Sequence, residues 1–224
     1  KTMRITVDGE LGAAVTAKDL ALHWIAELGA DGARGHAIEY AGPAVRALSM
    51  EGRLTLCNLS IEGGARLGLV APDQVTFDYI KGRNFAPKGA DWDTALRDWS
   101  QLATDKDARF DREVALNASD IAPTVTWGTS PEEALPITGH VPDPARLSGS
   151  KQAQARAALE YMALEPGMAL DQIAVDQVFI GSCTNGRIED LRLAAKVLAG
   201  RKAVVPGLVS PGSAQVKKQS EAEG

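Results

Sequence analysis

The chain has 224 residues, of which 45% are hydrophobic and 24% charged, a balance that excludes a disordered or fibrous protein. Its formal charge of -5 comes from mixed signs without a long basic block, so the sequence lacks the cationic footprint that nucleic-acid binding needs. No apolar run approaches the roughly 20 residues that cross a bilayer, and no signal peptide opens the chain; we therefore expect a soluble, cytoplasmic protein.

The two ends of the chain do not resemble natural termini. The chain begins at Lys1 without an initiator Met and ends in the polar run of residues 217–221. We therefore expect a fragment of a longer protein. The charged residues 104–111 include few apolar side chains, which predicts a domain boundary there and divides the chain into domains 1–111 and 112–224.

The first half of the chain alternates the patterns of strands and helices. Residues 3–7 alternate apolar and polar side chains, as a half-buried strand does. Thr16 suits the N-cap of a helix over 17–28, with Asp19 as its capping-box partner. A short strand is predicted around residues 38–40. This order predicts a mixed α/β fold.

Residues 50–67 have apolar side chains on nearly every face, which predicts one buried helix. Asn58 and Glu62 are among its polar exceptions, and their spacing of four places them on one face. An unpaired carboxylate buried there would cost on the order of several kcal/mol, so we expect a polar group opposite. The alternative is a less buried helix on which Glu62 pairs with Arg66. The glycines at 63–64 fit a helix end or a close contact with a neighbour.

The second half of the chain is predicted to contain another strand-loop-helix unit. Residues 175–180 predict a buried strand, followed by a loop over 181–187. Residues 138–150 are rich in Pro, Gly and Ser and predict an irregular surface loop. Apolar spacing predicts further packing helices over residues 74–81, 92–102, 152–164 and 188–199.

Cys183 lies between the predicted strand and the last helix, where ligands of open α/β sheets collect and a helix N-terminus favours a thiolate. Gly181 allows the backbone to approach a bulky group, and Thr184 or Asn185 can cap the helix. The alternative is a small apolar cysteine that fills a turn. Cys57 lies far away in the sequence, so we expect two reduced thiols rather than a disulfide.

The three histidines form no metal-binding pattern. No His or Cys lies three or four residues from His23, His36 or His140, so a structural or solvated role is expected for each. Residues 125–131, VTWGTSP, predict a tight turn after a short strand, to which the residues themselves assign no chemistry.

Two segments resemble the signatures of the aconitase family. They are GSCTNGRIEDLR at residues 181–192 and CNLSIEGGARLGLVAPD at 57–73, the latter in the form typical of the isopropylmalate branch. The resemblance covers essentially the whole chain and implies an aconitase-like α/β fold of three-layer α/β/α units with mixed or parallel sheets. It implies that Cys183 is one of three thiolate ligands of a 4Fe-4S cluster, with Asn58 and Glu62 as the active-site amide and carboxylate beside it.

The resemblance also implies a reaction. It is the interconversion of 2-isopropylmalate and 3-isopropylmalate in leucine biosynthesis, a dehydration and rehydration of a small dicarboxylic acid by an iron-sulfur hydro-lyase. The cluster iron without a cysteine would be the Lewis acid, and a carboxylate like Glu62 suits proton handling at the departing or attacking water. In this branch the base for the carbon-bound proton comes from a separate small subunit, which makes the enzyme a heterodimer.

The sequence departs from the family pattern in two ways. Gly186 stands where the family commonly has Ser, and this change is expected to loosen the loop without altering the ligand. The downstream C-x-x-C pair and the upstream His- and Asp-bearing domain do not occur in these residues, and Cys57 matches no ligand position. We therefore expect that this chain alone neither retains the cluster nor has activity.

Three alternatives remain open at this point. A homoaconitase or another small-diacid hydratase would share the same motifs. A cysteine-nucleophile enzyme would use Cys183 with a nearby histidine base. An RNA-binding relative of aconitase is disfavoured by the acidic balance of the chain.

Overall fold

A four-stranded sheet forms the centre of the protein in the computed structural model, which describes residues 1–224. The strands are β1 (Thr2–Asp8), β2 (Ala37–Ala41), β3 (Leu67–Val70) and β4 (Arg112–Asn117), in the order β3-β2-β1-β4. All three pairings are parallel. The predicted α/β class and the parallel sheet are confirmed.

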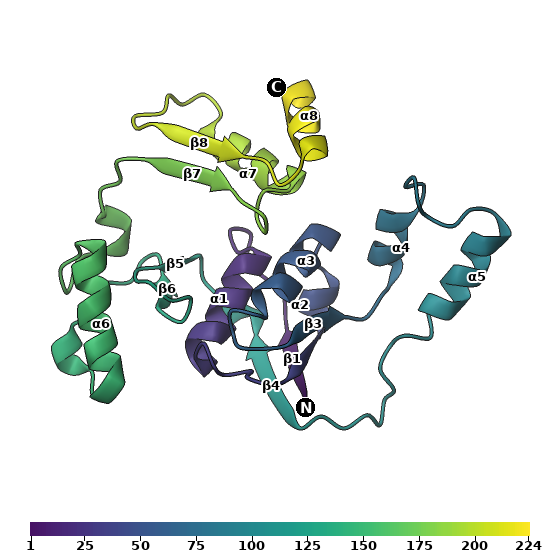
Figure 1. The fold of residues 1–224 in the computed structure, drawn as a ribbon, viewed down its shortest axis with the longest axis horizontal. Helices are drawn as coiled ribbons and strands as arrows, with labels where there is room; N and C mark the ends of the chain where they lie inside the picture. The colour runs from purple at the N-terminus through teal and green to yellow at the C-terminus, as the bar shows by residue number, and fades with distance from the viewer.

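One face of this sheet is buried against helices. In β1 the side chains of Met3, Ile5 and Val7 are fully buried and face the core, as their alternation with polar residues predicted. The covering helices are α1 (Ala17–Leu28), α2 (Pro43–Arg46) and α3 (Met50–Leu59), which contribute residues to the same hydrophobic cluster (Figure 1).

The opposite face of the sheet is largely open. Leu69 of β3 is 56% exposed on that face. The segment that leads into β4 crosses it, since the Arg4 guanidinium lies 4.7 Å from the ring centre of Phe110 and Thr104 contacts Glu39. The buried face of the sheet therefore carries the helices α1, α2 and α3.

The helix predicted over residues 50–67 ends early, at Leu59. Just after it, the Ser60 hydroxyl is hydrogen-bonded to the hydroxyl of Tyr40 at 2.7 Å and donates to the carbonyl of Leu56 at 3.1 Å. Gly63 then passes so close to Trp24 that a Cβ at this position would overlap the indole ring. These tertiary contacts turn the chain away from the helix axis. By contrast, α1 has the predicted bounds and capping box.

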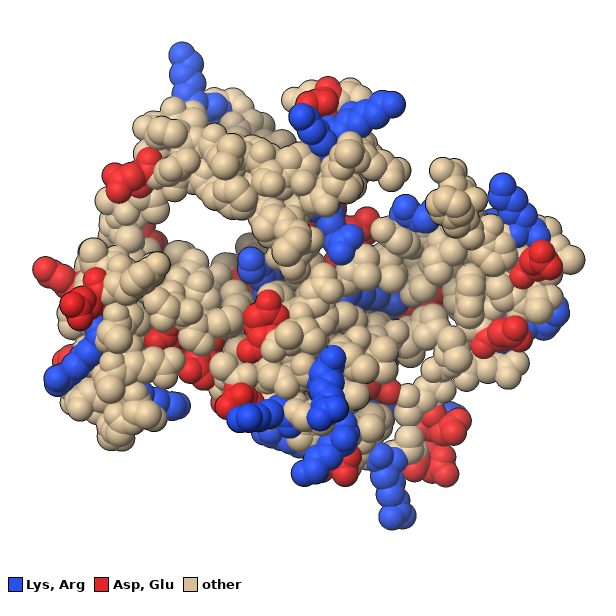
Figure 2. All heavy atoms as spheres, viewed as in Figure 1, with Lys and Arg blue, Asp and Glu red and all other residues tan.

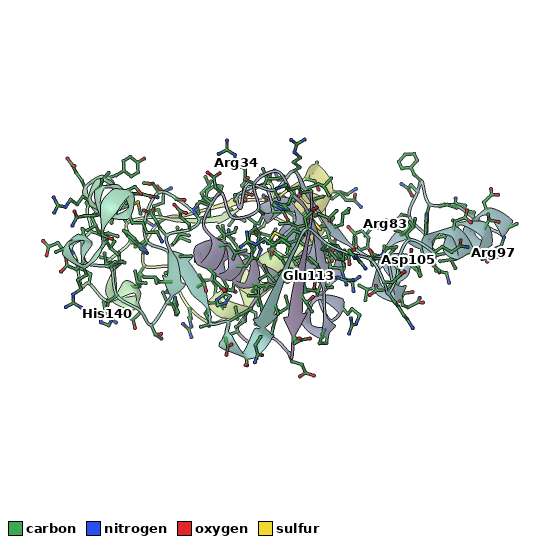
Figure 3. The ribbon with its side chains drawn as sticks, turned by 90° about the horizontal axis from the view of Figure 1, so that it is seen from below. Arg34, Arg83, Arg97, Asp105, Glu113 and His140 are labelled. Atoms are coloured by element: carbon green, nitrogen blue, oxygen red, sulfur yellow. The ribbon has the colours of Figure 1, made fainter.

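Two helices project beyond the β3 edge of the sheet as an arm, α4 (Gln74–Ile80) and α5 (Ala90–Trp99) (Figures 1 and 3). They pack on each other through aromatic rings, but neither has a buried residue. The root of the arm is fixed by Arg53 of α3, which is 2% exposed and donates to both carboxylate oxygens of Asp73 at 2.7 and 2.8 Å.

The first structural unit extends past the predicted boundary between residues 111 and 112. β4 pairs with β1 along its length, and Leu116, Ala118 and Ile121 belong to the hydrophobic core of the sheet. The charged linker before β4 is therefore an excursion within this unit rather than a connection between two.

A second, smaller core follows. The antiparallel pair β5 (Thr124–Thr126) and β6 (Ala134–Pro136) and the helix α6 (Gly149–Met162) surround a cluster that includes Trp127, Val141 and Leu159. Short 3₁₀ turns complete this part of the chain, η1 (Ala118–Asp120), η2 (Pro144–Arg146) and η3 (Leu170–Gln172). Figure 3 shows this unit, with His140, at the opposite end of the molecule from the arm.

The last unit contains β7 (Val178–Gly181), α7 (Ile188–Leu198), β8 (Gly207–Ser210) and α8 (Ala214–Glu223). β7 and β8 form a two-stranded parallel sheet. The predicted strand exists, but it is not buried, since Phe179 is 58% exposed. The unit shows a broad uncharged surface in Figure 2. No helix anywhere in the chain combines the length and apolar character that a bilayer crossing requires.

Candidate functional site

Cys183 lies in the loop between β7 and α7, where the sequence predicted it. The loop leaves the strand through Gly181 and Ser182, whose φ angles of 112° and 129° turn the chain sharply. The thiol is exposed, and its only side-chain hydrogen-bond partner is the hydroxyl of Thr184 at 3.9 Å. The cysteine is therefore available to a ligand and is not the apolar filler of a turn.

A second turn, residues 210–213, lies beside the cysteine loop. Because β7 and β8 are parallel neighbours, the loops that follow them leave the sheet at the same edge. The amide of Gly212 donates to the carbonyl of Gly186 at 2.7 Å, and the amide of Ser182 donates to the carbonyl of Ser210 at 3.3 Å. The sequence analysis missed this turn, although the Pro-Gly pair after an apolar run indicates one.

The cysteine loop and the start of α7 contact α3. The amide of Asn185 donates to the hydroxyl of Thr55 at 3.4 Å, and the hydroxyl of Ser49 donates to the carboxylate of Glu189 at 2.9 Å. Burial raises the pKa of the Glu189 carboxyl above its usual range, and the Ser49 hydrogen bond opposes that shift. A cavity of about 440 Å³ opens between these elements and the first turn of α1.

Asn58 and Glu62 are both exposed, but they do not lie on one helix as predicted. Asn58 is one turn beyond Thr55, so it continues the side of α3 that contacts Asn185. Glu62 lies in the turn after the helix. The alternative ion pair between Glu62 and Arg66 does not form. The carboxylate is thus open to solvent rather than buried against a partner.

The 224 residues fit one corner of a four-iron cluster and do not complete its ligand set. Cys183 supplies an exposed sulfur donor, whereas a cluster of this type needs several thiolates. Cys57 is half-buried on α3, and burial raises the pKa of its thiol to about 11. No three His, Cys, Asp or Glu side chains gather where they could hold a metal ion.

The histidines stand apart from Cys183. The ring of His23 lies 4.0 Å from the carboxylate of Glu27, His36 is hydrogen-bonded to a nearby backbone carbonyl, and His140 is exposed. None of them is hydrogen-bonded to the cysteine. The geometry therefore gives no support to a cysteine nucleophile with a histidine base.

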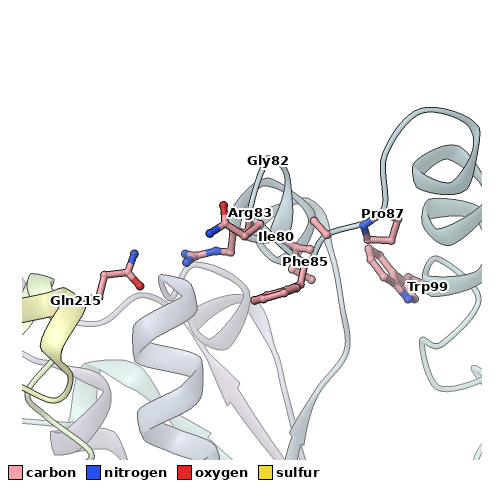
Figure 4. Close-up of a pocket in the computed structure, with 9 residues that line it drawn as sticks. Ile80, Gly82, Arg83, Phe85, Pro87, Trp99 and Gln215 are labelled. Atoms are coloured by element: carbon pink, nitrogen blue, oxygen red, sulfur yellow. The ribbon is translucent and has the colours of Figure 1, made fainter.

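A cavity of about 680 Å³ opens between the segment that joins α4 to α5 and the start of α8. There Arg83 reaches toward Gln215 of α8, and Trp99 faces Pro87 (Figure 4). No thiol, carboxylate or histidine lines this cavity. It lacks the groups that acid-base or metal chemistry would use.

A comparison with known protein families identifies one match for the chain. The family model described as "Aconitase family (aconitate hydratase)" matches residues 1–224. The match therefore includes the cysteine loop, the turn of residues 210–213 and the segment with Asn58 and Glu62.

Proposed function

We propose that this chain, which belongs to the aconitase family, forms part of an iron-sulfur hydro-lyase and provides one ligand of its cluster. Cys183 is the observation on which the proposal depends. Its thiol is exposed at the carboxyl edge of β7, immediately before the N-terminus of α7. An exposed thiol at the carboxyl end of a strand is in the position expected of a metal ligand rather than of a structural cysteine.

The proposed reaction is the interconversion of 2-isopropylmalate and 3-isopropylmalate. It is supported by the form of residues 57–73, which resembles the isopropylmalate branch of the family. We further propose a separate small subunit as the partner, a location in the cytoplasm and a role in leucine biosynthesis. The remaining cluster ligands would have to come from outside these 224 residues, because the described side chains supply one suitable thiol.

When bound, the cluster would supply a Lewis-acid iron for the hydroxyl of the substrate. Asn58 and Glu62 would act beside it. The Glu62 carboxylate makes no ion pair, so it is free to accept or donate a proton at a hydroxyl or water. The exposed amide of Asn58 can donate a hydrogen bond to a substrate carboxylate.

Substitution of the two cysteines tests the ligand assignment. In the reconstituted full-length protein, Cys183→Ser should abolish or greatly reduce the bound iron and sulfide, whereas Cys57→Ser should leave both unchanged. Iron and sulfide analysis together with visible absorption provides the measurement. Equal iron in the two variants would refute Cys183 as a ligand, and an active metal-free wild type would refute the iron-sulfur mechanism.

Substitution of Glu62 tests the proposed chemistry. Glu62→Gln keeps the size of the side chain but removes its acid-base function, so the turnover number should fall by about 10²- to 10⁴-fold with the cluster still present. Asp78→Asn, on the exposed surface of α4, is the matched control and should retain full turnover. Turnover in Glu62→Gln similar to wild type would exclude the carboxylate from proton transfer.

The substrate and the partner need their own assay. The full-length protein, mixed with its small subunit, should turn over 2-isopropylmalate faster than homologous diacids that lack the isopropyl branch. A higher kcat/KM for another diacid would retain the hydro-lyase proposal and replace the substrate. Full activity without any second polypeptide would refute the heterodimer.

A further inference from the structure

The cysteine loop is held on both sides of Cys183 by the same neighbouring turn. Before the cysteine, the amide of Ser182 donates to the carbonyl of Ser210 at 3.3 Å. After it, the carbonyl of Gly186 accepts from the amide of Gly212 at 2.7 Å. Only Cys183, Thr184 and Asn185 are left between these two contacts, and the cysteine is exposed. The backbone is fixed while the sulfur stays accessible.

The contact between the two turns is too close for side chains. A Cβ added at Gly186 would overlap the carbonyl oxygen of Ser182 in its own loop, and it would lie 2.8 Å from the amide nitrogen of Gly212 and 2.9 Å from the carbonyl oxygen of Ser210. A Cβ added at Gly212 would lie 3.0 Å from the carbonyl oxygen of Gly186. The expectation that Gly186 loosens the loop was therefore wrong. The missing side chain lets the two backbones approach and hydrogen-bond.

A side chain that ligates a metal from a loop needs contacts that hold the backbone of that loop in place. Residues that orient metal ligands without touching the metal typically change metal affinity by about 10- to 100-fold when they are altered. A loop of this length, residues 182–187, would have to be ordered each time the metal is bound if it lacked such contacts, and that ordering would reduce affinity. The parallel pairing of β7 with β8 supplies the support, because it places both turns at one sheet edge.

We propose that residues 210–213 are a positioning element that fixes Cys183 for cluster ligation through the Gly186–Gly212 contact. The proposal rests on the proposed function, since it assumes that Cys183 is a cluster ligand. It adds residues that neither bind the cluster nor touch the substrate. Ser210, Pro211 and Gly212 act only through the backbone of the cysteine loop.

Two substitutions loosen this contact by different means in the full-length protein. Gly186→Ala inserts a methyl group between the turns. Pro211→Gly inserts nothing, but it frees the backbone of the turn that makes both hydrogen bonds, so it should fold even if the first variant does not. Gly207→Ala is the matched control, because a Cβ at the start of β8 meets nothing closer than 3.9 Å.

Two measurements test the positioning role, the mobility of a label on Cys183 and the affinity for the cluster. A nitroxide label on Cys183, in a Cys57→Ser background without cluster, should be restricted in wild type and Gly207→Ala and mobile in the two loosened variants. After reconstitution, cluster affinity should fall by about 10- to 100-fold in those variants, while the far-UV spectrum of Pro211→Gly remains that of the control.

The outcomes separate the two proposals. A label that is equally mobile in wild type and in Pro211→Gly overturns the positioning role, whether or not the protein binds a cluster. Cluster affinity in Pro211→Gly equal to that of Gly207→Ala also overturns it. If the wild type restricts the label but binds no iron, the proposed function is refuted. The turn of residues 210–213 would then hold the cysteine loop, but not for cluster ligation.

Discussion

At the scale of single residues, the two thiols differ in exposure and should differ in reactivity. Burial raises the pKa of Cys57 to about 11, so about one Cys57 in a thousand is a thiolate at pH 8. Cys183 is exposed. Iodoacetamide at pH 8 should therefore alkylate Cys183 at least about tenfold faster in the metal-free protein. Peptide mass spectrometry over a time course measures both rates, and faster labelling of Cys57 would contradict the burial described for α3.

Glu189 is expected to titrate above the usual carboxyl range. Burial raises its pKa, so the folded state binds the proton more tightly than the unfolded state. Its contribution to stability is then complete below the unfolded pKa and is lost as the pH rises through the folded pKa. Ser49→Ala should raise the pKa further, because it removes the hydrogen bond to the carboxylate. Carbon-13 NMR titration of the carboxyl group tests this, and an ordinary midpoint in wild type would refute it.

The sequence predicted the local environment of Cys183 better than that of Glu62, and the reason is physical. The cysteine's environment is local, because an apolar strand, a glycine and a helix N-terminus follow one another along the chain. The environment of Glu62 depends on the Ser60 bond to Tyr40 and on the fit of Gly63 against Trp24. Helical periodicity contains no information about those partners. The helix predicted over residues 50–67 is therefore longer than α3, which ends at Leu59.

At the scale of elements, the pair of Arg53 and Asp73 joins the arm to α3. Arg53→Met leaves the Asp73 carboxylate without its cation and should lower the free energy of unfolding by about 3 kcal/mol, the low end for a buried pair because Asp73 is 35% exposed. Urea denaturation at pH 7 measures the loss. Asp73→Asn, which keeps an N-cap for α4, breaks the same pair from the other side and should also lower the free energy of unfolding.

The same pair predicts a pH dependence. The hydrogen bond from Arg53 holds the pKa of Asp73 below its usual range. The stability that it adds is present above the unfolded pKa of about 3.9 and is lost as the pH falls through the lower folded value. The difference between wild type and Arg53→Met should therefore shrink when the denaturation is repeated at pH 3. An undiminished difference would show that lost packing, not the ion pair, causes the effect.

Gly63 fixes the end of α3 against α1. In Gly63→Ala the methyl group would overlap the ring of Trp24, so we expect a loss of about 1 to 3 kcal/mol from overpacking. Gly12→Ala is the control, since the nearest atom there would be a Val15 methyl carbon at 3.5 Å. Thermal unfolding followed by tryptophan fluorescence distinguishes them. Equal melting temperatures would mean that the turn after α3 adapts without cost.

At the scale of the whole molecule, the units should differ in local stability. The β1–β4 sheet has fully buried residues such as Ile5, whereas Phe179 in β7 and Leu208 in β8 are more than half exposed. Native-state hydrogen exchange should therefore show β1 and β2 as the most protected strands. The amides of β7 and β8 should exchange through local openings of lower free energy. Equal protection of the two sheets would show that the molecule unfolds as one cooperative body.

The arrangement of units was less predictable than the units themselves. Helix bounds such as Ala17–Leu28 follow from capping and spacing, which are local. The placement of β4 beside β1 and the exposure of β7 depend on pairings across many residues. An apolar run predicts that a strand forms. It does not say which surface will cover that strand, so the predicted burial of β7 was wrong.

The position of β1 in its sheet has a consequence for synthesis on the ribosome. β1 is an inner strand, yet the β4 residue that pairs with Met3 is Arg112, which is made long after β2 and β3. Until then one edge of β1 has free backbone donors and acceptors, which can pair with another nascent chain. The nascent protein therefore passes through a stage in which the unpaired edge of β1 needs shielding, and a chaperone that binds extended apolar segments would act at that stage.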